Sequence, residues 1–120
     1  MDLIILLEIN KLTRNYSMKS AVFEILTWRS AAGVAKQTMI DAMHEFSHDV
    51  KQLPGFLQQS LYQNASNEWV CIYYWETEKQ AKESNSAVAD KANFLALMAL
   101  IVSDSVTIEI MQPLQTCSRD

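Results

Sequence analysis

The chain has 120 residues with a net charge of -4, and 49% of its residues are hydrophobic against 20% charged. These values are typical of one globular domain with a buried core, and they exclude a disordered chain. The acidic balance offers no basic surface for nucleic acid, and two cysteines, Cys71 and Cys117, are too few for a disulfide framework. We therefore expect a reduced, cytoplasmic protein that does not bind nucleic acid.

The N-terminal segment, residues 1–17, has two readings. Its apolar run, Leu3 to Leu7, follows Asp2 where a signal peptide carries positive charge, and it is far shorter than the roughly 20 residues that span a bilayer. No membrane partner is therefore expected. The segment is either an upstream extension before a natural start at Met18, or an added strand or helix that covers an apolar surface, such as a partner subunit's.

Residues 21–29, AVFEILTWR, predict the first strand, because β-branched and aromatic residues dominate both of its faces. A strand covered on both sides is typical of the centre of a sheet. Residues 34–53 predict the longest helix, whose apolar stripe comprises Met39, Ala42, Met43, Phe46, Val50 and Leu53. Its opposite side is polar and carries His44 and His48. The helix stops before Pro54, since the residue before a proline is pushed out of the helical region.

A hairpin follows, with a Pro54-Gly55 turn, strands at residues 56–63 and 69–76, and a polar turn at residues 64–68. Regular alternation in the first strand places Leu57, Gln59 and Leu61 on one face, and Phe56, Gln58, Ser60 and Tyr62 on the other. In the second strand, one face holds Trp69, Cys71, Tyr73 and Trp75, and the other holds Val70, Ile72 and Tyr74. Such a hairpin is only marginally stable alone, so other segments must cover its faces.

Two further helices are predicted after the hairpin. Thr77 and Gln80 fit a capping box, in which the Thr77 side chain accepts from the Gln80 backbone and the Gln80 side chain reaches back. The box predicts a helix at residues 78–89. Asp90 is expected to cap a helix at residues 92–102, which is apolar on all sides and should therefore be deeply buried or lie at an interface.

Residues 106–111 alternate and predict a last, half-covered strand, before a tail at residues 114–120. The order strand, helix, strand, strand, helix, strand is that of an α+β, ferredoxin-like split βαβ sandwich, here spanning residues 18–113. One antiparallel sheet carries its helices on one face. The other face is too apolar to stand in water, so we expect a homodimer through sheet faces.

Three stretches carry a family resemblance: the Trp28-Arg29 end of the first strand, the Leu53-Pro54-Gly55-Phe56 turn, and the Trp69 to Trp75 strand with its Glu76-Thr77 continuation. Over residues 21–113 the chain resembles the antibiotic biosynthesis monooxygenase-like (ABM) family of the dimeric α+β barrel superfamily. The resemblance implies a homodimer, with a small pocket between sheet and helices in each subunit. Characterised members of the family that it resembles include cofactor-free oxygenases that act on polycyclic phenols, haem-degrading enzymes, and enzymes that act on small signalling molecules. A shared fold does not transfer chemistry.

No cofactor or metal is expected. The haem-degrading branch has an asparagine on the first strand and a histidine on a later helix, whereas here the first strand has no asparagine and no histidine follows His48. Phosphate loops, serine triads and dinucleotide fingerprints are also absent from the sequence. Asp41, His44 and His48 have a spacing that can hold a metal on a helix, yet all three fall on its polar side, where a solvated face is favoured.

Glu24 and His44 are the candidate catalytic residues. Glu24 is the only carboxylate inside the central strand, and burial in a pocket would raise its pKa and make it a general base. The alternative, which the sequence favours, is a carboxylate paired with Arg29, a tyrosine or the partner chain. His44 would carry protons only if a loop or a partner subunit folds over its face.

The candidate substrate-binding residues are aromatic side chains at strand spacing with two polar neighbours: Trp28, Trp69, Tyr73 and Trp75, together with Gln58 and Ser60. They would line a pocket for a small, flat aromatic ligand, although such aromatics are more often core and dimer contacts. Two hypotheses remain: a cofactor-independent monooxygenase or related enzyme, and a non-catalytic module for small-molecule binding or assembly. A pocket with Glu24 or a histidine beside a tryptophan favours catalysis, and a filled aromatic core favours the module.

Overall fold

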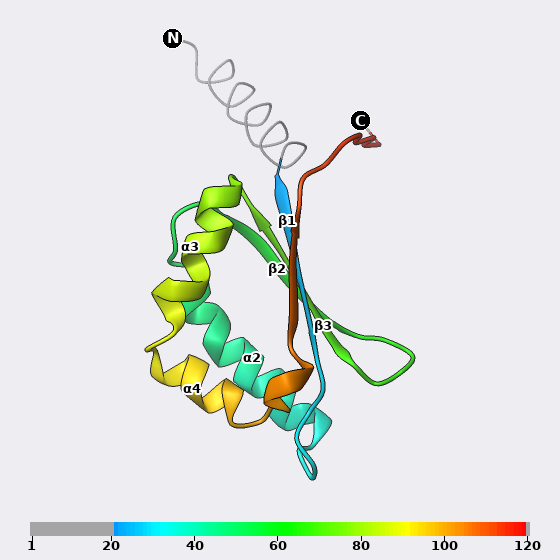
Figure 1. Ribbon diagram of the computed structural model, residues 1–120, viewed down its shortest axis with the longest axis vertical. Coiled ribbons are helices and arrows are strands. Elements are labelled where there is room, and N and C mark those ends of the chain that lie inside the picture. The colour runs from blue at the N-terminus through cyan, green and yellow to red at the C-terminus, as the bar shows by residue number, and fades with distance from the viewer. Residues whose placement is uncertain (1–20, 120) are drawn as a thin grey trace.

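The computed structural model describes residues 21–119, which form a four-stranded antiparallel sheet with helices on one side (Figure 1). Its elements in chain order are strand β1 Val22–Trp28, helix α2 Lys36–Val50, strands β2 Phe56–Gln63 and β3 Trp69–Trp75, helices α3 Glu78–Val88 and α4 Ala92–Met98, a 3-10 turn η1 Ser103–Ser105, and strand β4 Thr107–Met111. The strand order is β2-β3-β1-β4. The predicted α+β ferredoxin-like fold is therefore confirmed.

The predictions for residues 1–17 lie outside the described residues. Within residues 21–119, none of the helices has the length and apolar character that a membrane crossing requires. After Met111 the chain forms no further helix or strand up to residue 119.

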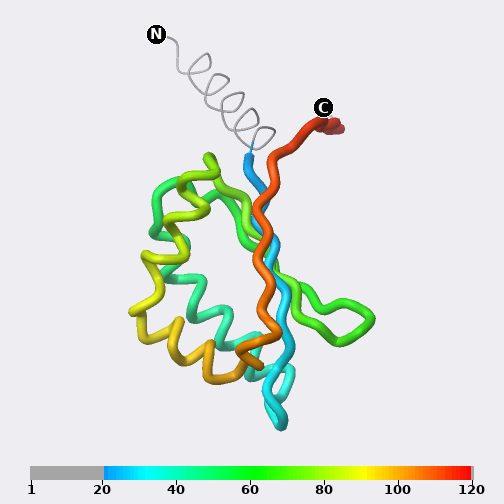
Figure 2. Tube along the Cα trace, in the orientation of Figure 1, coloured from blue at the N-terminus to red at the C-terminus, as the bar shows by residue number. Residues whose placement is uncertain are grey.

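Helix α2 covers the sheet with its predicted apolar stripe. Met39, Met43, Phe46 and Val50 are all buried against the sheet or the other helices. The helix begins at Lys36 and not at the expected Val34, because Ala35 still has an extended backbone. Helices α2, α3 and α4 lie on the same side of the sheet (Figure 2), so the sheet has one covered and one open face.

Strand β1 lies at the centre of the sheet, as its two apolar faces predict, between β3 and β4. Its register with β3 pairs Glu24 with Tyr73, Leu26 with Cys71, and Trp28 with Trp69. Because side chains alternate along a strand, these residues all point to the face that the helices cover. The register thus places a carboxylate, a thiol and several aromatic rings on the covered face, in one row along β1 and a neighbouring row along β3.

Strand β2 departs from the predicted alternation at its start. Phe56 pairs with Trp75 and Gln58 with Tyr74, so Leu57 is an extra residue in a bulge. The prediction that Phe56 shares a face with Gln58 was therefore wrong. Its ring instead meets the Trp75 ring edge to face on the covered side, with the centroids 5.9 Å apart.

The capping box at the start of α3 forms only in part. Thr77 Oγ1 accepts from the Gln80 backbone N–H at 3.2 Å, as predicted. The Gln80 side chain does not reach back, because it lies over Gly55, where an added Cβ would come within 1.9 Å of its Oε1. Gly55 also has a φ of +81°, which glycine adopts without strain.

Helix α4 is shorter and more exposed than predicted. Its N-cap is Lys91 and not Asp90, and it ends at Met98. Leu97 faces the core, but Leu95 is 59% exposed, so the helix is not deeply buried within residues 21–119. The alternative expectation, that this helix lies at an interface, stays a prediction.

The open face of the sheet is mainly apolar at its centre. It carries Phe23, Ile25, Val70, Ile72 and Tyr74, none of which is fully buried. Ile25 lies opposite Ile72, and the rings of Phe23 and Tyr74 meet edge to face with centroids 5.4 Å apart. None of the described helices covers this face.

Candidate functional site

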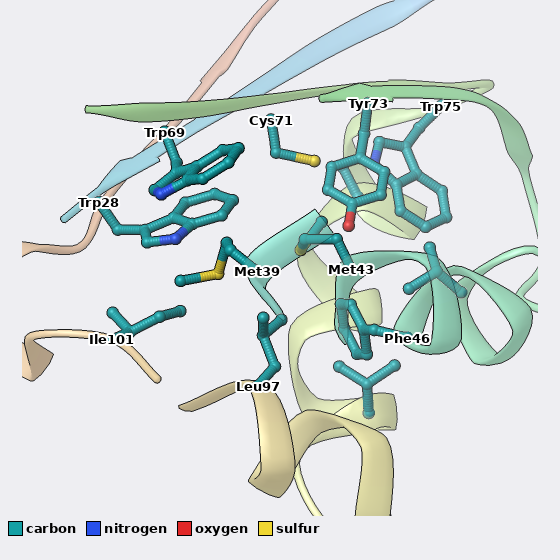
Figure 3. Packing of buried hydrophobic residues seen from close by; sticks show 13 residues of the cluster. Trp28, Met39, Met43, Phe46, Trp69, Cys71, Tyr73, Trp75, Leu97 and Ile101 are labelled. Carbon is teal, nitrogen blue, oxygen red and sulfur yellow. The ribbon is translucent and has the colours of Figure 1, made fainter. Parts of the chain in front are cut away.

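A cavity of about 270 Å³ lies between the covered face of the sheet and the helices. Figure 3 shows Trp28, Tyr73 and Trp75 extending from the strands toward the side chains of α2 and α4. The sheet contributes Glu24, Leu26, Trp28, Cys71, Tyr73 and Trp75, and the helices contribute among others Met43, Phe46, Asn85, Val88 and Leu97. The cavity lies where the resemblance places a pocket. Its walls are apolar apart from a few groups on β1, β3 and α3.

Glu24 is the polar centre of this cavity. Its side chain is only 2% exposed, and it is the only charged residue that is fully buried in residues 21–119. Trp75 Nε1 donates to Glu24 Oε1 at 2.9 Å across the β1–β3 ladder. This partner is neither Arg29 nor a tyrosine, the two intrachain partners that the sequence favoured. The second oxygen, Oε2, is buried and makes no hydrogen bond of standard geometry within residues 21–119, although the side-chain amide of Asn85 lies near enough to the carboxyl group to lower its pKa.

Burial raises the pKa of Glu24 above the ordinary value for a glutamate. Removal of the carboxylate from water is the main cause, because a low dielectric disfavours the charged form. The indole N–H of Trp75 and, to a smaller extent, the side-chain amide of Asn85 act against it and lower the pKa. Glu24 therefore holds its proton to a higher pH than an exposed glutamate does.

Trp28 supplies a second polar atom without a partner. The residue is 3% exposed, and its Nε1 makes no hydrogen bond within residues 21–119. In Figure 3 the ring edge that carries this nitrogen lies toward Met39 and Ile101, away from the strand. An indole N–H can only donate, so Trp28 Nε1 is an enclosed donor that lacks an acceptor within residues 21–119.

Two other groups on the walls stay neutral. Burial raises the pKa of Cys71 to about 11, although its sulfur accepts from Gln59 Nε2 at 3.4 Å. Burial also raises the pKa of Tyr73 well above its ordinary range. Neither the thiol nor the phenol can therefore act as a base near neutral pH, so Glu24 is the remaining candidate among the titratable residues that line the cavity.

Helix α3 contributes wall residues that sequence reasoning missed. Ser84 is buried and donates to the Ala81 carbonyl at 2.6 Å, while Asn85 lines the cavity and remains open to solvent. The spacing of Ala81, Ser84 and Val88 marks the covered face of α3. This signal could have found the wall, because Asn85 borders that face.

The structure places four of the predicted site residues outside the cavity. His44 is exposed on α2, where its ring contacts His48 with centroids 5.0 Å apart. Gln58 and Ser60 lie opposite Tyr74 and Ile72 on the open face of the sheet. Trp69 is buried, but its Nε1 donates to Ser30 Oγ at 2.8 Å, and the residue does not line the cavity.

The same helix face holds no metal cluster. Asp41 accepts instead from the Gln37 side chain at 2.9 Å. Over residues 21–119, no three His, Cys, Asp or Glu side chains gather into a group that could hold a metal ion.

Known structures with the same fold include small oxygenases. No protein-family model and no curated protein sequence matches the chain. SnoaB from Streptomyces nogalater, a cofactor-independent oxygenase, matches with a TM-score of 0.64 and 18% identity over 81% of this chain and 96% of its own. The monooxygenase ActVA-Orf6 of Streptomyces coelicolor, solved with the ligand nanaomycin D, matches with a TM-score of 0.66 and 16% identity over 85% and 95%. The chain has the fold of these ABM-type oxygenases.

A dimeric ferredoxin-like protein from an uncultured marine organism has the same fold. It matches with a TM-score of 0.64 and 6% identity over 87% of this chain and 96% of its own. Likeness at these identities shows the fold and carries no activity with it. The predicted resemblance to the ABM family is confirmed at that level, and the chemistry must come from the cavity itself.

Proposed function

We propose that the protein is a cofactor-independent monooxygenase that binds a small aromatic molecule in the cavity beside Glu24. The observation that carries this proposal is a buried carboxyl group with one unpartnered oxygen, set among tryptophan and tyrosine rings. Perturbed carboxyl groups in apolar cavities are typical of general bases. The fold shared with cofactor-independent oxygenases adds support by analogy.

The size of the cavity favours a ligand with few rings. At about 270 Å³ it is slightly smaller than most ligand pockets. It is larger than an engineered protein cavity of about 150 Å³ that takes up benzene. A molecule with two fused rings therefore suits it, and Trp28, Tyr73 and Trp75 offer the aromatic surfaces on which such a ligand packs.

The reaction needs no electron donor besides the substrate. Glu24 accepts the hydroxyl proton of an electron-rich phenol, and the phenolate passes electrons to O₂. One oxygen atom then enters the ring carbon opposite the hydroxyl as a carbonyl, while the other leaves as water with the two hydrogens that the substrate loses. The product is a quinone. Glu24 moves protons throughout, and the apolar walls keep bulk water from the intermediate.

Oxygen uptake with 1,5-dihydroxynaphthalene tests this proposal, since the expected products are 5-hydroxy-1,4-naphthoquinone and water. We expect one ¹⁸O atom from ¹⁸O₂ in the quinone. Glu24→Gln should lower turnover about 10²- to 10⁴-fold, the usual contribution of a general base. Glu45→Gln, which changes an exposed glutamate of α2, is the matched control. If Glu24→Gln turns over at the wild-type rate, Glu24 is not the base.

The alternative is a binding module without catalysis. It is supported by the Trp75 N–H, which holds one carboxyl oxygen of Glu24 as a structural hydrogen bond would. In that case the naphthalenediol would bind, but no oxygen would be consumed above the rate without protein. The same assay, paired with a binding titration, therefore separates the two functions.

We also propose that two chains pair through the open faces of their sheets. The central row of this face, with Ile25, Ile72 and Tyr74, has an apolar character that a monomer rarely leaves in water. A protein with the same fold is described as dimeric, which supports the proposal by analogy.

A cytoplasmic location is part of the same proposal. Cys71 and Cys117 are both free, and Cys117 is exposed. An exposed free thiol is typical of proteins in a reducing compartment.

A further inference from the structure

A second hollow lies at the end of the sheet where β1 leads into α2 and where β2 turns into β3. It has a volume of about 370 Å³, and it shares no wall residue with the cavity beside Glu24. We call it the hairpin cleft. Its walls come from the β1–α2 connection and from the β2–β3 hairpin: Arg29, Ser30, Val34 and Lys36, with Gln63, Ser66, Asn67 and Trp69.

The β1–α2 connection brings two cations to this cleft. Gly33 has a φ of +83°, which lets the chain reverse its direction between β1 and α2. The Val34 N–H donates to the Ala31 carbonyl at 3.2 Å and closes the turn. Arg29 and Lys36 are both exposed and both line the cleft. The turn thus sets a guanidinium group and an ammonium group around one hollow.

These two charges have no counter-charge within residues 21–119. Both ion pairs of this part of the chain lie on α3, so neither Arg29 nor Lys36 has a carboxylate partner there. None of the residues that line the cleft is acidic. Glu68 follows the hairpin turn but does not line the cleft, and its side chain accepts from Asn64 at 3.2 Å. The cleft is therefore a positive site in a chain whose net charge is -4.

The hairpin adds neutral donors on an ordered turn. Asn64 Oδ1 accepts from the backbone N–H groups of Ser66 and Glu68, both at 3.0 Å. Gln63 Nε2 donates to the Asn67 carbonyl at 3.3 Å. The Ser66 hydroxyl and the Asn67 side-chain amide make no hydrogen bond within residues 21–119, so both can donate to a ligand.

A phosphate group matches this set of donors. A guanidinium group binds phosphate through two parallel N–H bonds, and an ammonium group adds a point charge. A carboxylate carries a single negative charge, whereas a phosphate monoester carries nearly two near neutral pH and offers three acceptor oxygens. Two cations with a hydroxyl and an amide donor therefore favour the phosphate.

We propose that the hairpin cleft binds a phosphate group, either as the free ion or as the monoester of a small molecule. Arg29 and Lys36 supply the charge, and Ser66 and Asn67 supply neutral hydrogen bonds. Val34, which is half-buried, offers apolar surface to an organic part of the ligand. This site is independent of the proposed monooxygenase function, so the failure of one leaves the other standing.

Titration of the ¹⁵N-labelled full chain with inorganic phosphate, followed by NMR, tests the proposal. At an ionic strength of about 10 mM, charges act over about 30 Å, so a sodium chloride titration at matched ionic strength measures screening alone. We expect the backbone signals of Ser30, Lys36 and Asn67 to shift with half-saturation at about 1 mM phosphate, as a few charge-assisted hydrogen bonds at an exposed site allow. Chloride should shift them far less.

Two variants remove the charges one at a time. Arg29→Gln and Lys36→Gln should each weaken phosphate binding about tenfold, since each removes one charged partner. The hydrogen bonds that Arg29 makes with Ser105 and Val102 come from its backbone, so its substitution leaves them in place. Lys51→Gln is the matched control, because it removes the same charge from the other end of α2, outside the cleft.

Equal shifts with phosphate and chloride would overturn the proposal. Equal weakening in Lys36→Gln and Lys51→Gln would also overturn it, because phosphate would then respond only to the general charge of the surface. Phenyl phosphate, titrated in the same way, identifies the source of the phosphate group. Tighter binding than that of inorganic phosphate assigns the cleft to a phosphorylated small molecule, and equal or weaker binding assigns it to the free ion.

Discussion

At the scale of single residues, Glu24 makes one structural hydrogen bond and has a second carboxyl oxygen without a hydrogen-bond partner. Its Oε1 joins β1 to β3 through Trp75, and its Oε2 remains without a partner beside the cavity. A buried polar atom without a partner destabilises the folded chain by about 1–3 kcal/mol. Such a cost is typical of functional sites, where a ligand supplies the missing partner.

The raised pKa of Glu24 predicts how stability depends on pH. The folded chain holds the Glu24 proton to a higher pH than the unfolded chain does, so the free energy of unfolding falls as the pH rises from the unfolded pKa through the folded one. Glu24→Gln cannot ionise and can keep the Trp75 bond. Its stability relative to wild type should therefore increase as the pH rises from the ordinary glutamate pKa through the raised pKa of folded Glu24.

Urea denaturation of both proteins at several pH values measures this difference. Glu45→Gln again serves as the control for loss of one exposed carboxylate. A stability difference between Glu24→Gln and wild type that stays constant with pH would show that Glu24 titrates as an ordinary glutamate.

At the scale of elements, the turn before β2 depends on a glycine. Gly55 has a φ of +81°, accepts at its carbonyl from the Glu76 N–H at 2.9 Å, and lies under the Gln80 side chain. The bulge that follows it brings Phe56 onto Trp75 and so helps to position the Glu24 partner. The turn thus supports one wall of the cavity.

Two glycine substitutions separate backbone strain from this contact. Gly33 has a φ of +83° but open space around it, so Gly33→Ala should cost about 1 kcal/mol of stability from strain alone. Gly55→Ala must also displace the Gln80 side chain and should cost roughly 2 kcal/mol. Urea denaturation measures both values. Equal losses would mean that Gln80 moves aside freely and that the contact contributes nothing.

The sequence predicted the elements better than their details. Periodicity predicted each strand and the stripe of α2, because burial on one face leaves a repeat that can be read directly. It could not predict the bulge at Leu57, since a local insertion in the ladder leaves no periodic signal, and regular alternation then placed Phe56 on the wrong face. The Thr77 cap was predicted correctly. The return hydrogen bond from the Gln80 side chain was not, because this side chain packs over Gly55, and a contact between distant parts of the chain cannot be predicted from a local motif.

The site was predictable only in part, for a related reason. Glu24 stood out because a carboxylate interrupts an apolar strand, and Trp28, Tyr73 and Trp75 share the face of β1 and β3 that lines the cavity. Asn85 is one of many polar residues on α3 and gave no signal of its own. Gln58 and Ser60 were assigned to the pocket without a register, and their pairing with Tyr74 and Ile72 places them on the open face.

At the scale of the whole molecule, the open sheet face predicts a dimer that one charge should break. Ile72 lies at the centre of this face, between Ile25 on β1 and Ser60 on β2. Ile72→Lys would place a charge in the proposed interface, where its desolvation is unfavourable. Light scattering after size exclusion should give the mass of two chains for wild type and of one chain for the variant.

Leu95→Lys provides the matched control for the dimer. Leu95 is also an apolar residue, 59% exposed, but it lies on α4 on the other side of the sheet. Its substitution should leave the mass at two chains. A wild-type protein with the mass of one chain would contradict the sheet-to-sheet pairing.

The central claim is that the cavity between sheet and helices is the ligand site, and filling it tests that claim most directly. Leu26 lies on the cavity wall between Glu24 and Trp28, so Leu26→Trp should occupy the space that the ligand needs. The measurement is a calorimetric titration of 1,5-dihydroxynaphthalene under argon, with circular dichroism to show that the variant is folded. We expect binding to wild type and at least a tenfold loss of affinity in Leu26→Trp. A folded Leu26→Trp that binds as tightly as wild type would contradict the claim, because the ligand would then lie elsewhere.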